Sequence, residues 1–454
     1  MNRKERKYYK ENLQEVLHTT LNPYEPGVVR IHLVPAKYRP FGADPSVVIL
    51  NGKDILPINL SWTILLANFI KEVNKYKGGE VTEDDLQDVI NKTVDETYKV
   101  YHPNKQVMKE DLQLILQVFI DIAEGREPAI SVGQMSLAQY ANKMTAPHRM
   151  DLLVSSMTKG GKWNCNQKCL HCYAAGQPLA DVRELSTEEW KRVIDKCREA
   201  KIPQLTFTGG EPTIREDLVE LIEYSKWFVT RLNTNGVMLT KKLCHDLMDA
   251  SLDSVQITFY SSDEDTHNTL VGSKNYQKTL TGLKNALKEG LAVSVNTPLC
   301  KINSEYVDTL KFLHELGVKY VTCSGLIVTG NATKNESKST QLSKTDLYKI
   351  LKDAKKFCDD HLMEIAFTSP GWIASDKLQS LGMNVPTCGA CLSNMAVAPN
   401  GNVVPCQSWL NKESSLGNML EDSWDSIWYS EECKKIRKNS TELNNKCPLK
   451  EGGC

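Results

Sequence analysis

The stretch that decides the fold is NCNQKCLHCYAAG (164–176), which places Cys165, Cys169 and Cys172 at the spacing C-x3-C-x2-C. Three thiolates packed into one short loop can bind three corners of a cubic iron–sulfur cluster and leave the fourth iron open. A structural zinc ion would need a fourth ligand nearby, and His171 is the only local candidate. Because His171 is adjacent to Cys172 in the chain, we expect it to pack beside the cluster and not to bind metal.

The open iron corner can bind a substrate. S-adenosylmethionine (SAM) can chelate such an iron through its amino and carboxylate groups. One electron from the cluster then splits the sulfonium and produces a 5′-deoxyadenosyl radical. An open-cornered cluster of this kind would therefore supply radical chemistry.

Strand-like and helical segments alternate around this motif, from about residue 150 to residue 370. That order predicts parallel strands joined by crossover helices, which close into a partial (β/α)6 barrel similar to a TIM barrel. Active sites in such barrels lie at the carboxyl ends of the strands. The predicted strands are 150–156, 204–208, 228–233, 254–260, 291–297 and 320–328.

The second of these strands ends in TFTGGEP (206–212). Gly209 and Gly210 allow the backbone to approach a ligand closely, and the Glu211 carboxylate can meet the positively charged amino group of SAM. Taken alone, the same residues also describe an ordinary Gly-Gly turn with Pro212 opening a helix.

The cysteine triplet with its trailing His-Cys-Tyr, followed by TFTGGEP, resembles the radical SAM superfamily over at least residues 150–330. The resemblance implies a [4Fe-4S] cluster on the three cysteines, bound SAM, and a flavodoxin or ferredoxin as the external reductant. It also implies SAM contacts at strand ends, where Asn and Thr are otherwise common turn residues. The implied cofactor-binding residues are Tyr173, Gly209, Gly210, Glu211, Asn235, Thr258 and Asn296.

A second group of cysteines occupies the tail, about 371–454. The segment CGACLSNMAVAPNGNVVPC (388–406) is similar to the opening half of the SPASM extension, which carries auxiliary iron–sulfur clusters. The Asn400-Gly401 turn would bring the two arms of this segment together. The metal ligands expected in the tail are Cys388, Cys391, Cys406, Cys433, Cys447 and Cys454.

The closing half departs from the SPASM pattern, because Lys450 stands where a thiolate would precede Cys454. Two fully cysteine-ligated clusters need eight thiolates, and the tail offers six. We therefore expect one complete auxiliary [4Fe-4S] cluster, or two with open or non-cysteine corners; a zinc ribbon is the alternative. Cys433 lies in a helical context, and the isolated cysteines are expected to be packing residues: Cys197, Cys244, Cys300, Cys323 and Cys358.

Region 1–130 has a different pattern. Apolar runs at 28–34, 46–52 and 55–60 predict a β-hairpin, and Ser61 is the predicted cap of the helix that follows. Two further helices are predicted to start at Thr82 and near Lys109. This order resembles the winged-helix-like recognition element that accompanies peptide-modifying radical enzymes, which captures a precursor-peptide leader as an added strand. A DNA-binding winged helix is disfavoured because its groove-reading helix is acidic.

Length and composition limit the remaining possibilities. A chain of 454 residues, with 41% hydrophobic and 24% charged residues, is expected to form two or three globular domains. A net charge of -1 argues against general attraction to nucleic acid or anionic lipid. The chain has no apolar run of about 18 residues, and no apolar stretch near its start, so we expect a cytoplasmic protein without membrane partners. The segment KNESKST (334–340) is predicted to be a polar surface loop.

These observations predict an α/β protein with three domains: a winged-helix-like leader-recognition domain (1–130), a radical SAM barrel (131–370) and a SPASM- or Twitch-like iron–sulfur domain (371–454). The predicted activity is removal of a hydrogen atom from a ribosomally made precursor peptide, followed by formation of a thioether or carbon–carbon crosslink. The alternatives are maturation of a protein side chain, modification of a small cofactor precursor, or a metal-bound winged-helix regulator. The sequence names no catalytic base.

Overall fold

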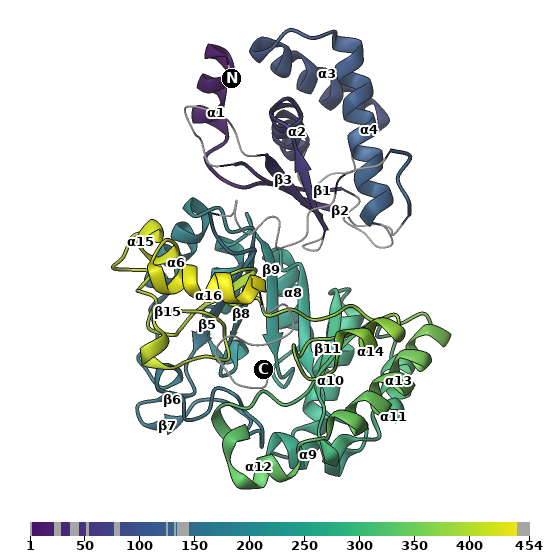
Figure 1. Ribbon diagram of the computed structural model, residues 1–454, viewed down its shortest axis with the longest axis vertical. Coiled ribbons are helices and arrows are strands. Elements are labelled where there is room, and N and C mark those ends of the chain that lie inside the picture. Colours follow the sequence, from purple (N-terminus) through teal and green to yellow (C-terminus); the bar gives the residue numbers. More distant parts are fainter. Residues whose placement is uncertain are drawn as a thin grey trace. The chain divides into compact units, whose positions relative to one another are not determined.

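The computed structural model describes residues 2–21, 29–36, 45–50, 54–76, 82–123, 126–130, 133 and 145–442. The chain divides into two compact units, Met1–His148 with Cys197–Pro203, and Arg149–Lys196 with Gln204–Cys454 (Figure 1). Among the described helices, none is both long enough and apolar enough to cross a membrane.

The first unit is an antiparallel four-stranded sheet in the order β1-β2-β3-β4, with helices packed on one face (Figure 1). Alternate strand residues such as Val29, Ile31 and Leu33 are fully buried because they point toward the helices. The elements are α1 (Arg3–Asn12), β1 (Leu17–Leu21), β2 (Val29–Val34), β3 (Ser46–Leu50), β4 (Asp54–Ile58), α2 (Leu60–Val73), α3 (Glu83–Val100) and α4 (Lys105–Ala123).

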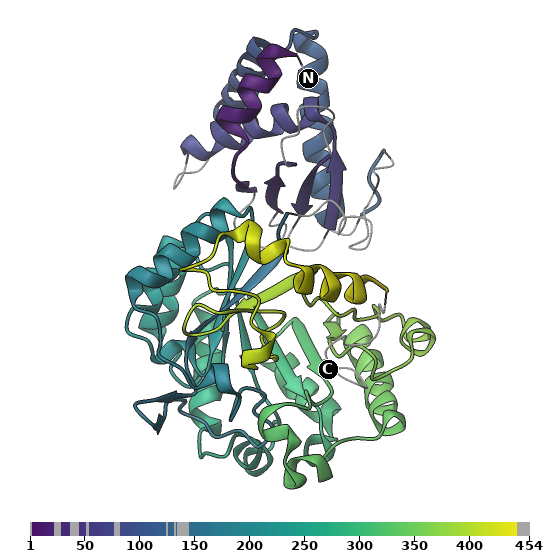
Figure 2. The same ribbon diagram turned by 60° about the vertical axis from the view of Figure 1, so that its left-hand side comes forward.

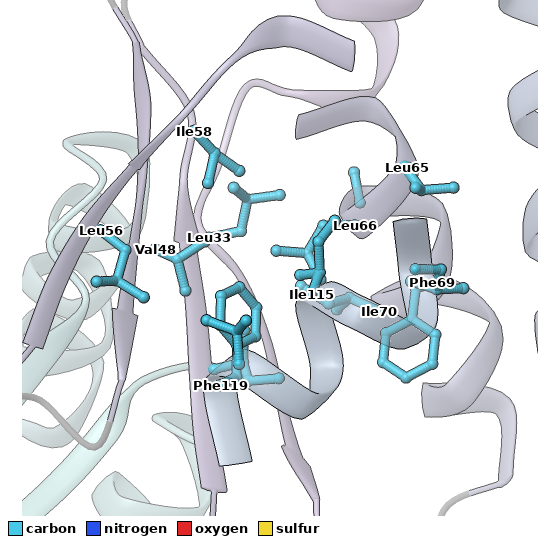
Figure 3. Packing of buried hydrophobic residues seen from close by; sticks show 14 of the residues in the cluster. Leu33, Val48, Leu56, Ile58, Leu65, Leu66, Phe69, Ile70, Ile115 and Phe119 are labelled. Carbon is cyan, nitrogen blue, oxygen red and sulfur yellow. The ribbon is translucent and has the colours of Figure 1, made fainter. Parts of the chain in front are cut away.

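The core of this unit lies between the sheet and the helices, and it includes Leu33 of β2, Phe69 and Ile70 of α2, and Phe119 of α4 (Figure 3). These apolar side chains come from segments far apart in sequence, so the helices and the sheet stabilise one another. Phe69 has no solvent exposure.

The predicted hairpin and the three helices after it are present, with three differences. The α2 cap is Asn59 and not Ser61: the Asn59 side chain accepts from the Trp62 backbone N–H, and the Ser61 hydroxyl donates to Asn59. Helix α4 begins at Lys105, ahead of the predicted start near Lys109. Helix α1 and strand β1 were not predicted. Thr82 caps α3 as expected, and Gly52 in the predicted turn lies outside the described residues.

The second unit contains the predicted partial barrel. Strands β5, β8, β9, β10, β11 and β12 are parallel neighbours in chain order, which confirms the (β/α)6 arrangement and the α/β fold class. Their bounds are β5 (Arg149–Ser155), β8 (Gln204–Gly209), β9 (Val229–Thr234), β10 (Ser254–Thr258), β11 (Val293–Pro298) and β12 (Tyr320–Ser324).

Three further strands extend this sheet. Strand β13 (Glu364–Phe367) pairs in parallel with β12, and β14 (Asn394–Val397) pairs in parallel with β5. Strand β15 (Val403–Val404) continues from β14 as an antiparallel hairpin. The cysteine-rich tail is therefore built onto the edge of the barrel sheet, as Figure 2 shows for the yellow segment beside it.

Helices cover the outside of this barrel and the tail (Figures 1 and 2). A short hairpin of β6 (Thr158–Lys159) and β7 (Lys162–Trp163) precedes the cysteine triplet. The helices are α6 (Thr187–Glu199), α7 (Leu218–Tyr224), α8 (Lys241–Asp249), α9 (Glu264–Val271), α10 (Tyr276–Lys288), α11 (Tyr306–Glu315), α12 (Asn335–Ser339), α13 (Lys344–Asp360), α14 (Ser375–Ser380), α15 (Trp424–Trp428) and α16 (Glu431–Glu442).

We predict that Phe69→Ala destabilises the first unit by about 3–5 kcal/mol, because it removes a buried ring and leaves a cavity. Peptide-resolved hydrogen exchange of the full chain should show faster exchange across α2 and α4. Leu86→Ala is the control, since Leu86 is 41% exposed and its loss should change stability by less than about 0.5 kcal/mol. Unchanged protection in Phe69→Ala would show that this core does not hold the unit together.

Candidate functional site

The cysteine triplet lies on the loop after β5 and β7, at the carboxyl end of the barrel strands. All three of its cysteines are half-buried and line one cavity of about 480 Å³. Six of the seven predicted cofactor-binding residues line the same cavity, whereas Glu211 does not. The six are Tyr173, Gly209, Gly210, Asn235, Thr258 and Asn296.

The C-terminal end of helix α9 braces the cysteine loop. The Lys168 backbone N–H donates to the Val271 carbonyl, and that of Leu170 donates to the Leu270 carbonyl, both at 2.9 Å. Gly272 ends the helix with a φ of +61°, and a Cβ at this position would lie 2.3 Å from the Lys168 carbonyl oxygen. Only glycine allows the helix end and the loop to approach this closely.

A second brace comes from residues 331–340. The Ser337 hydroxyl donates to the Leu170 carbonyl at 2.8 Å, and His171 Nε2 lies 2.7 Å from the Thr340 hydroxyl. The Asn331 backbone N–H donates to the Cys172 carbonyl at 2.9 Å. The polar segment 334–340 lies at the surface as predicted, since most of its residues are exposed. It is not a loop, however, because its middle forms helix α12, and Ser337 is buried where its hydroxyl meets the cysteine loop. His171 packs beside the triplet as expected.

The donor groups around the triplet suit an anionic iron–sulfur cluster. Burial raises the pKa of Cys165 to about 12 and raises the pKa of Cys169 and Cys172, so the free thiols are neutral and must lose protons when they bind iron. Asn166 Nδ2 and Gln167 Nε2 are buried donors without a hydrogen-bond acceptor among the described residues. Such donors fit the sulfur atoms of a cluster, whose properties depend on hydrogen bonds to sulfur.

Glu211 is fully buried and holds two strand ends together. Its carboxylate accepts hydrogen bonds from the backbone N–H of Asn235 at 2.8 Å and of Thr213 at 3.0 Å. The Thr234 hydroxyl donates to it at 2.6 Å, and the Thr213 hydroxyl donates as well. Burial raises the pKa of Glu211, and these hydrogen bonds oppose that shift. The carboxylate thus fixes Asn235 at the cavity wall.

Gly209 lies at the cavity, and its backbone conformation and its closeness to Ser155 also require glycine at this position. Its φ is +137°, and a Cβ there would lie 2.4 Å from the Ser155 carbonyl oxygen. The end of β8 therefore lies directly against the end of β5. This close approach joins the strand that leads into the cysteine loop to the strand that carries the GGE sequence.

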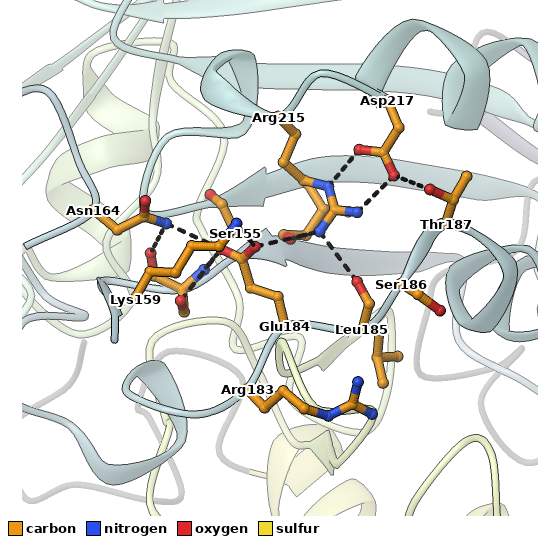
Figure 4. A network of polar contacts seen from close by, with 12 residues as sticks. Ser155, Lys159, Asn164, Arg183, Glu184, Leu185, Ser186, Thr187, Arg215 and Asp217 are labelled. Atoms are coloured by element: carbon orange, nitrogen blue, oxygen red, sulfur yellow. Dashed lines mark hydrogen bonds and ion pairs between the residues drawn. The ribbon is translucent and has the colours of Figure 1, made fainter. Parts of the chain in front are cut away.

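A polar network fixes the chain just before the triplet (Figure 4). The partly buried Glu184 carboxylate accepts from the Ser156 backbone N–H and from Asn164 Nδ2, both at 3.0 Å. Arg215 lies 3.6 Å from Glu184, donates to the Val154 carbonyl at 2.8 Å and pairs with Asp217 at 2.7 Å. Because Asn164 directly precedes Cys165, this network sets where the cysteine loop starts.

Our sequence reasoning missed the polar interior of the barrel. Strands β9, β10 and β11 alternate between buried and partly exposed residues, and the partly exposed positions other than Pro298 are polar. Asn296 accepts from the Thr322 hydroxyl at 2.9 Å, and Gln256 donates to the same hydroxyl at 3.3 Å. The period-two pattern in consecutive strands was the available signal. The additional cavity-lining strand residues include Thr206, Arg231, Gln256 and Thr322.

The structure also gathers the described tail cysteines. Cys433, on α16, accepts a hydrogen bond from the Cys391 thiol, which together with Arg437 lowers the pKa of Cys433 to about 7, while burial raises the pKa of Cys391. Cys406 lies close enough to Cys391 to raise that pKa further. The Ser440 hydroxyl, also on α16, lies 4.0 Å from Cys388 Sγ.

Other cysteine predictions have mixed outcomes. Cys447 and Cys454 lie outside the described residues. Among the side chains that the structure describes, no three Cys, His, Asp or Glu residues converge on a single-ion site. The five isolated cysteines are buried, as expected of packing residues: Cys197, Cys244, Cys300, Cys323 and Cys358.

A parallel barrel that places a cysteine triplet and a polar cavity at the carboxyl ends of its strands defines an iron–sulfur enzyme. Comparison with known families specifies which kind. Residues 164–313 match the radical SAM superfamily, and residues 388–451 match the iron–sulfur cluster-binding domain called SPASM. The chain therefore contains a radical SAM domain and a SPASM domain, which indicate an enzyme that binds [4Fe-4S] clusters and SAM.

Two curated relatives come from Methanosarcina barkeri (strain Fusaro / DSM 804). The chain is 28% identical to an Fe-coproporphyrin III synthase over 59% of its own length and 72% of the relative's. It is 27% identical to an AdoMet-dependent heme synthase over 63% of its own length and 85% of the relative's.

Solved structures show a similar fold. Streptococcus suis SuiB bound to precursor peptide SuiA has a TM-score of 0.57 at 14% identity and covers 87% of each chain. Native anSMEcpe with bound AdoMet has a TM-score of 0.52 at 18% identity, covering 65% of this chain and 84% of its own.

We predict that Glu211→Gln weakens SAM binding about tenfold or more while the iron content of the triplet cluster stays unchanged. The amide must place its NH₂ against one of two backbone N–H groups, which leaves a buried donor unsatisfied at a cost of about 1–3 kcal/mol. Equilibrium dialysis of SAM against the reconstituted enzyme measures this. Glu216→Gln, at an exposed position nearby, is the control; equal affinity in both variants would contradict a positioning role for Glu211.

Proposed function

We propose that this enzyme modifies a ribosomally made precursor peptide by removing a hydrogen atom from one residue and closing a thioether or carbon–carbon crosslink. The bound cluster and SAM supply a 5′-deoxyadenosyl radical for that removal. The observation that carries the proposal is the common cavity of about 480 Å³, which puts the cysteine triplet and the polar strand ends of the barrel around one space.

The residues of the site have distinct proposed roles. Cys165, Cys169 and Cys172 hold the cluster that SAM completes, and the six predicted residues in the cavity wall orient SAM. Glu211 positions Asn235 from behind the wall. Cys388, Cys391, Cys406 and Cys433 hold an auxiliary cluster, and Cys447 and Cys454 are proposed as additional tail ligands. A flavodoxin or ferredoxin supplies electrons in the reducing cytoplasm.

The extent of the structural similarity favours a peptide substrate. The second unit makes up about two thirds of the chain, so a match to SuiB over 87% of the chain includes part of the first unit. The first unit is a sheet with two edge strands, β1 and β4. An extended leader can pair with such an edge through backbone hydrogen bonds. Because Pro57 has no backbone N–H, the β4 edge has one hydrogen-bond donor fewer for pairing with a leader.

A small cofactor precursor is the second candidate substrate. It is favoured by the two curated relatives, whose names refer to an iron coproporphyrin and to heme. Incubation of the reduced enzyme with SAM and either a candidate precursor peptide or an iron porphyrin separates the candidates. A peptide crosslink appears in mass spectrometry as the loss of two hydrogen atoms. A modified porphyrin with unchanged peptide would overturn the proposal.

We expect Cys165→Ala, Cys169→Ala and Cys172→Ala each to abolish formation of 5′-deoxyadenosine from SAM with dithionite under anaerobic conditions. Each change removes a thiolate that the open-cornered cluster requires. Cys244→Ala is the matched control, because Cys244 is buried in α8 away from both cysteine groups. Chromatography of the reaction mixture measures the nucleoside; deoxyadenosine formation at the normal rate in any of the three variants would contradict this assignment.

We also expect the intact enzyme to process the full precursor peptide at least tenfold more efficiently (kcat/KM) than a peptide lacking the leader. Leader capture supplies binding energy away from the reacting residue. Addition of the separate leader should restore part of the loss. The rate of 5′-deoxyadenosine formation without any peptide is the control for the activity of the enzyme itself. Equal efficiency for the two peptides would show that the first unit does not capture a leader.

A further inference from the structure

Helix α16 presents a polar face to the segment that carries Cys388 and Cys391. Cys433, Arg437 and Ser440 are spaced four and three residues apart, so they lie on one side of the helix. Arg437 Nε donates to the Cys391 carbonyl at 3.1 Å, and the Ser440 hydroxyl donates to the Ala390 carbonyl at 2.7 Å. This face therefore meets the tail cysteines directly.

The Arg437 guanidinium is held from several sides at once. Its Nη2 atom donates to Cys433 Sγ at 3.3 Å and to the Trp428 carbonyl at 2.6 Å. Its central carbon lies 3.5 Å from the centroid of the Trp428 ring, which is fully buried. The position of the cation is thus fixed by hydrogen bonds and by stacking.

Among the described residues no carboxylate forms an ion pair with Arg437. Its described hydrogen-bond acceptors are two backbone carbonyls and one cysteine sulfur. A partly buried cation without a counter-charge is costly. The groups beside it that can become anionic are the thiols of Cys391 and Cys433. Thiolates bound to a four-iron cluster would give the site the negative charge that balances the guanidinium.

We propose that Arg437 is the counter-charge of the auxiliary cluster and raises its reduction potential through its charge and its N–H···S hydrogen bond. This inference rests on the ligand assignment made under the proposed function. Reduction by one electron adds negative charge to the cluster, and a fixed cation beside a ligand sulfur stabilises that reduced form. The cluster thereby becomes a better acceptor for the electron released when the substrate radical closes its new bond.

The experiment uses the full chain carrying Cys165→Ala, Cys169→Ala and Cys172→Ala, in which an auxiliary cluster is the only one left to observe. Its midpoint potential is measured by dithionite titration followed by electron paramagnetic resonance. Arg437→Gln should lower the ratio of reduced to oxidised cluster at fixed potential at least tenfold, which is a shift of about 59 mV for one electron. Lys434→Gln is the control, because Lys434 lies on the same helix and pairs with exposed Glu431.

Arg437→Lys keeps the positive charge but changes the hydrogen-bond geometry. The midpoint potential of its auxiliary cluster should therefore lie between those of the parent and of Arg437→Gln. If Arg437→Gln assembles no cluster, restored iron content in Arg437→Lys supports the counter-charge. Loss of the cluster in both variants, or an unchanged midpoint in Arg437→Gln, overturns the inference. The absence of any cluster signal in the parent also overturns it, while leaving the proposed radical chemistry at the triplet untouched.

Discussion

The structure depends on holding three thiols on one short loop so that they face a shared cavity. The loop packs against two hydrophobic clusters through residues such as Leu170 and Tyr173, and hydrogen bonds to its backbone add to these contacts in fixing its position. Helix α9 and the segment 331–340 supply such bonds, and the Glu184 network holds the side chain of Asn164, which directly precedes the loop's first cysteine. The barrel helices and strands thus hold the cysteine loop in position. Functional residues on a loop depend on such a rigid scaffold.

The barrel could be predicted from the sequence because its strands and helices are local patterns. Apolar runs separated by periodic helical segments gave all six strands of the partial barrel, and the cysteine spacing gave its chemistry. The pairing of β14 with β5 joins residues more than 240 positions apart, and no local pattern reveals it. Asn59 and Ser61 are both good helix caps, so the sequence alone did not decide between them.

Site residues without an apolar signature were the hardest to predict. Ser337 is buried although its segment is polar, because its hydroxyl meets a backbone carbonyl of the cysteine loop. Arg437 belongs to no motif, and its importance becomes visible only when α16 is placed beside Cys391. Glu211 was predicted from its motif, yet the structure gives its carboxylate internal partners that the motif alone does not show.

The two cysteine groups are physically connected within the second unit. Gln177, five residues after Cys172, donates to the Tyr173 and Ser408 carbonyls and accepts from the Leu410 backbone N–H. The Tyr173 side chain is close enough to Cys172 and to Cys406 for both to raise its pKa. Because Gln407 also lines the cavity, the tail forms part of its wall. The loop that holds the triplet and the segment that carries Cys406 therefore line one cavity, which is the arrangement that the proposed electron acceptor beside the reaction requires.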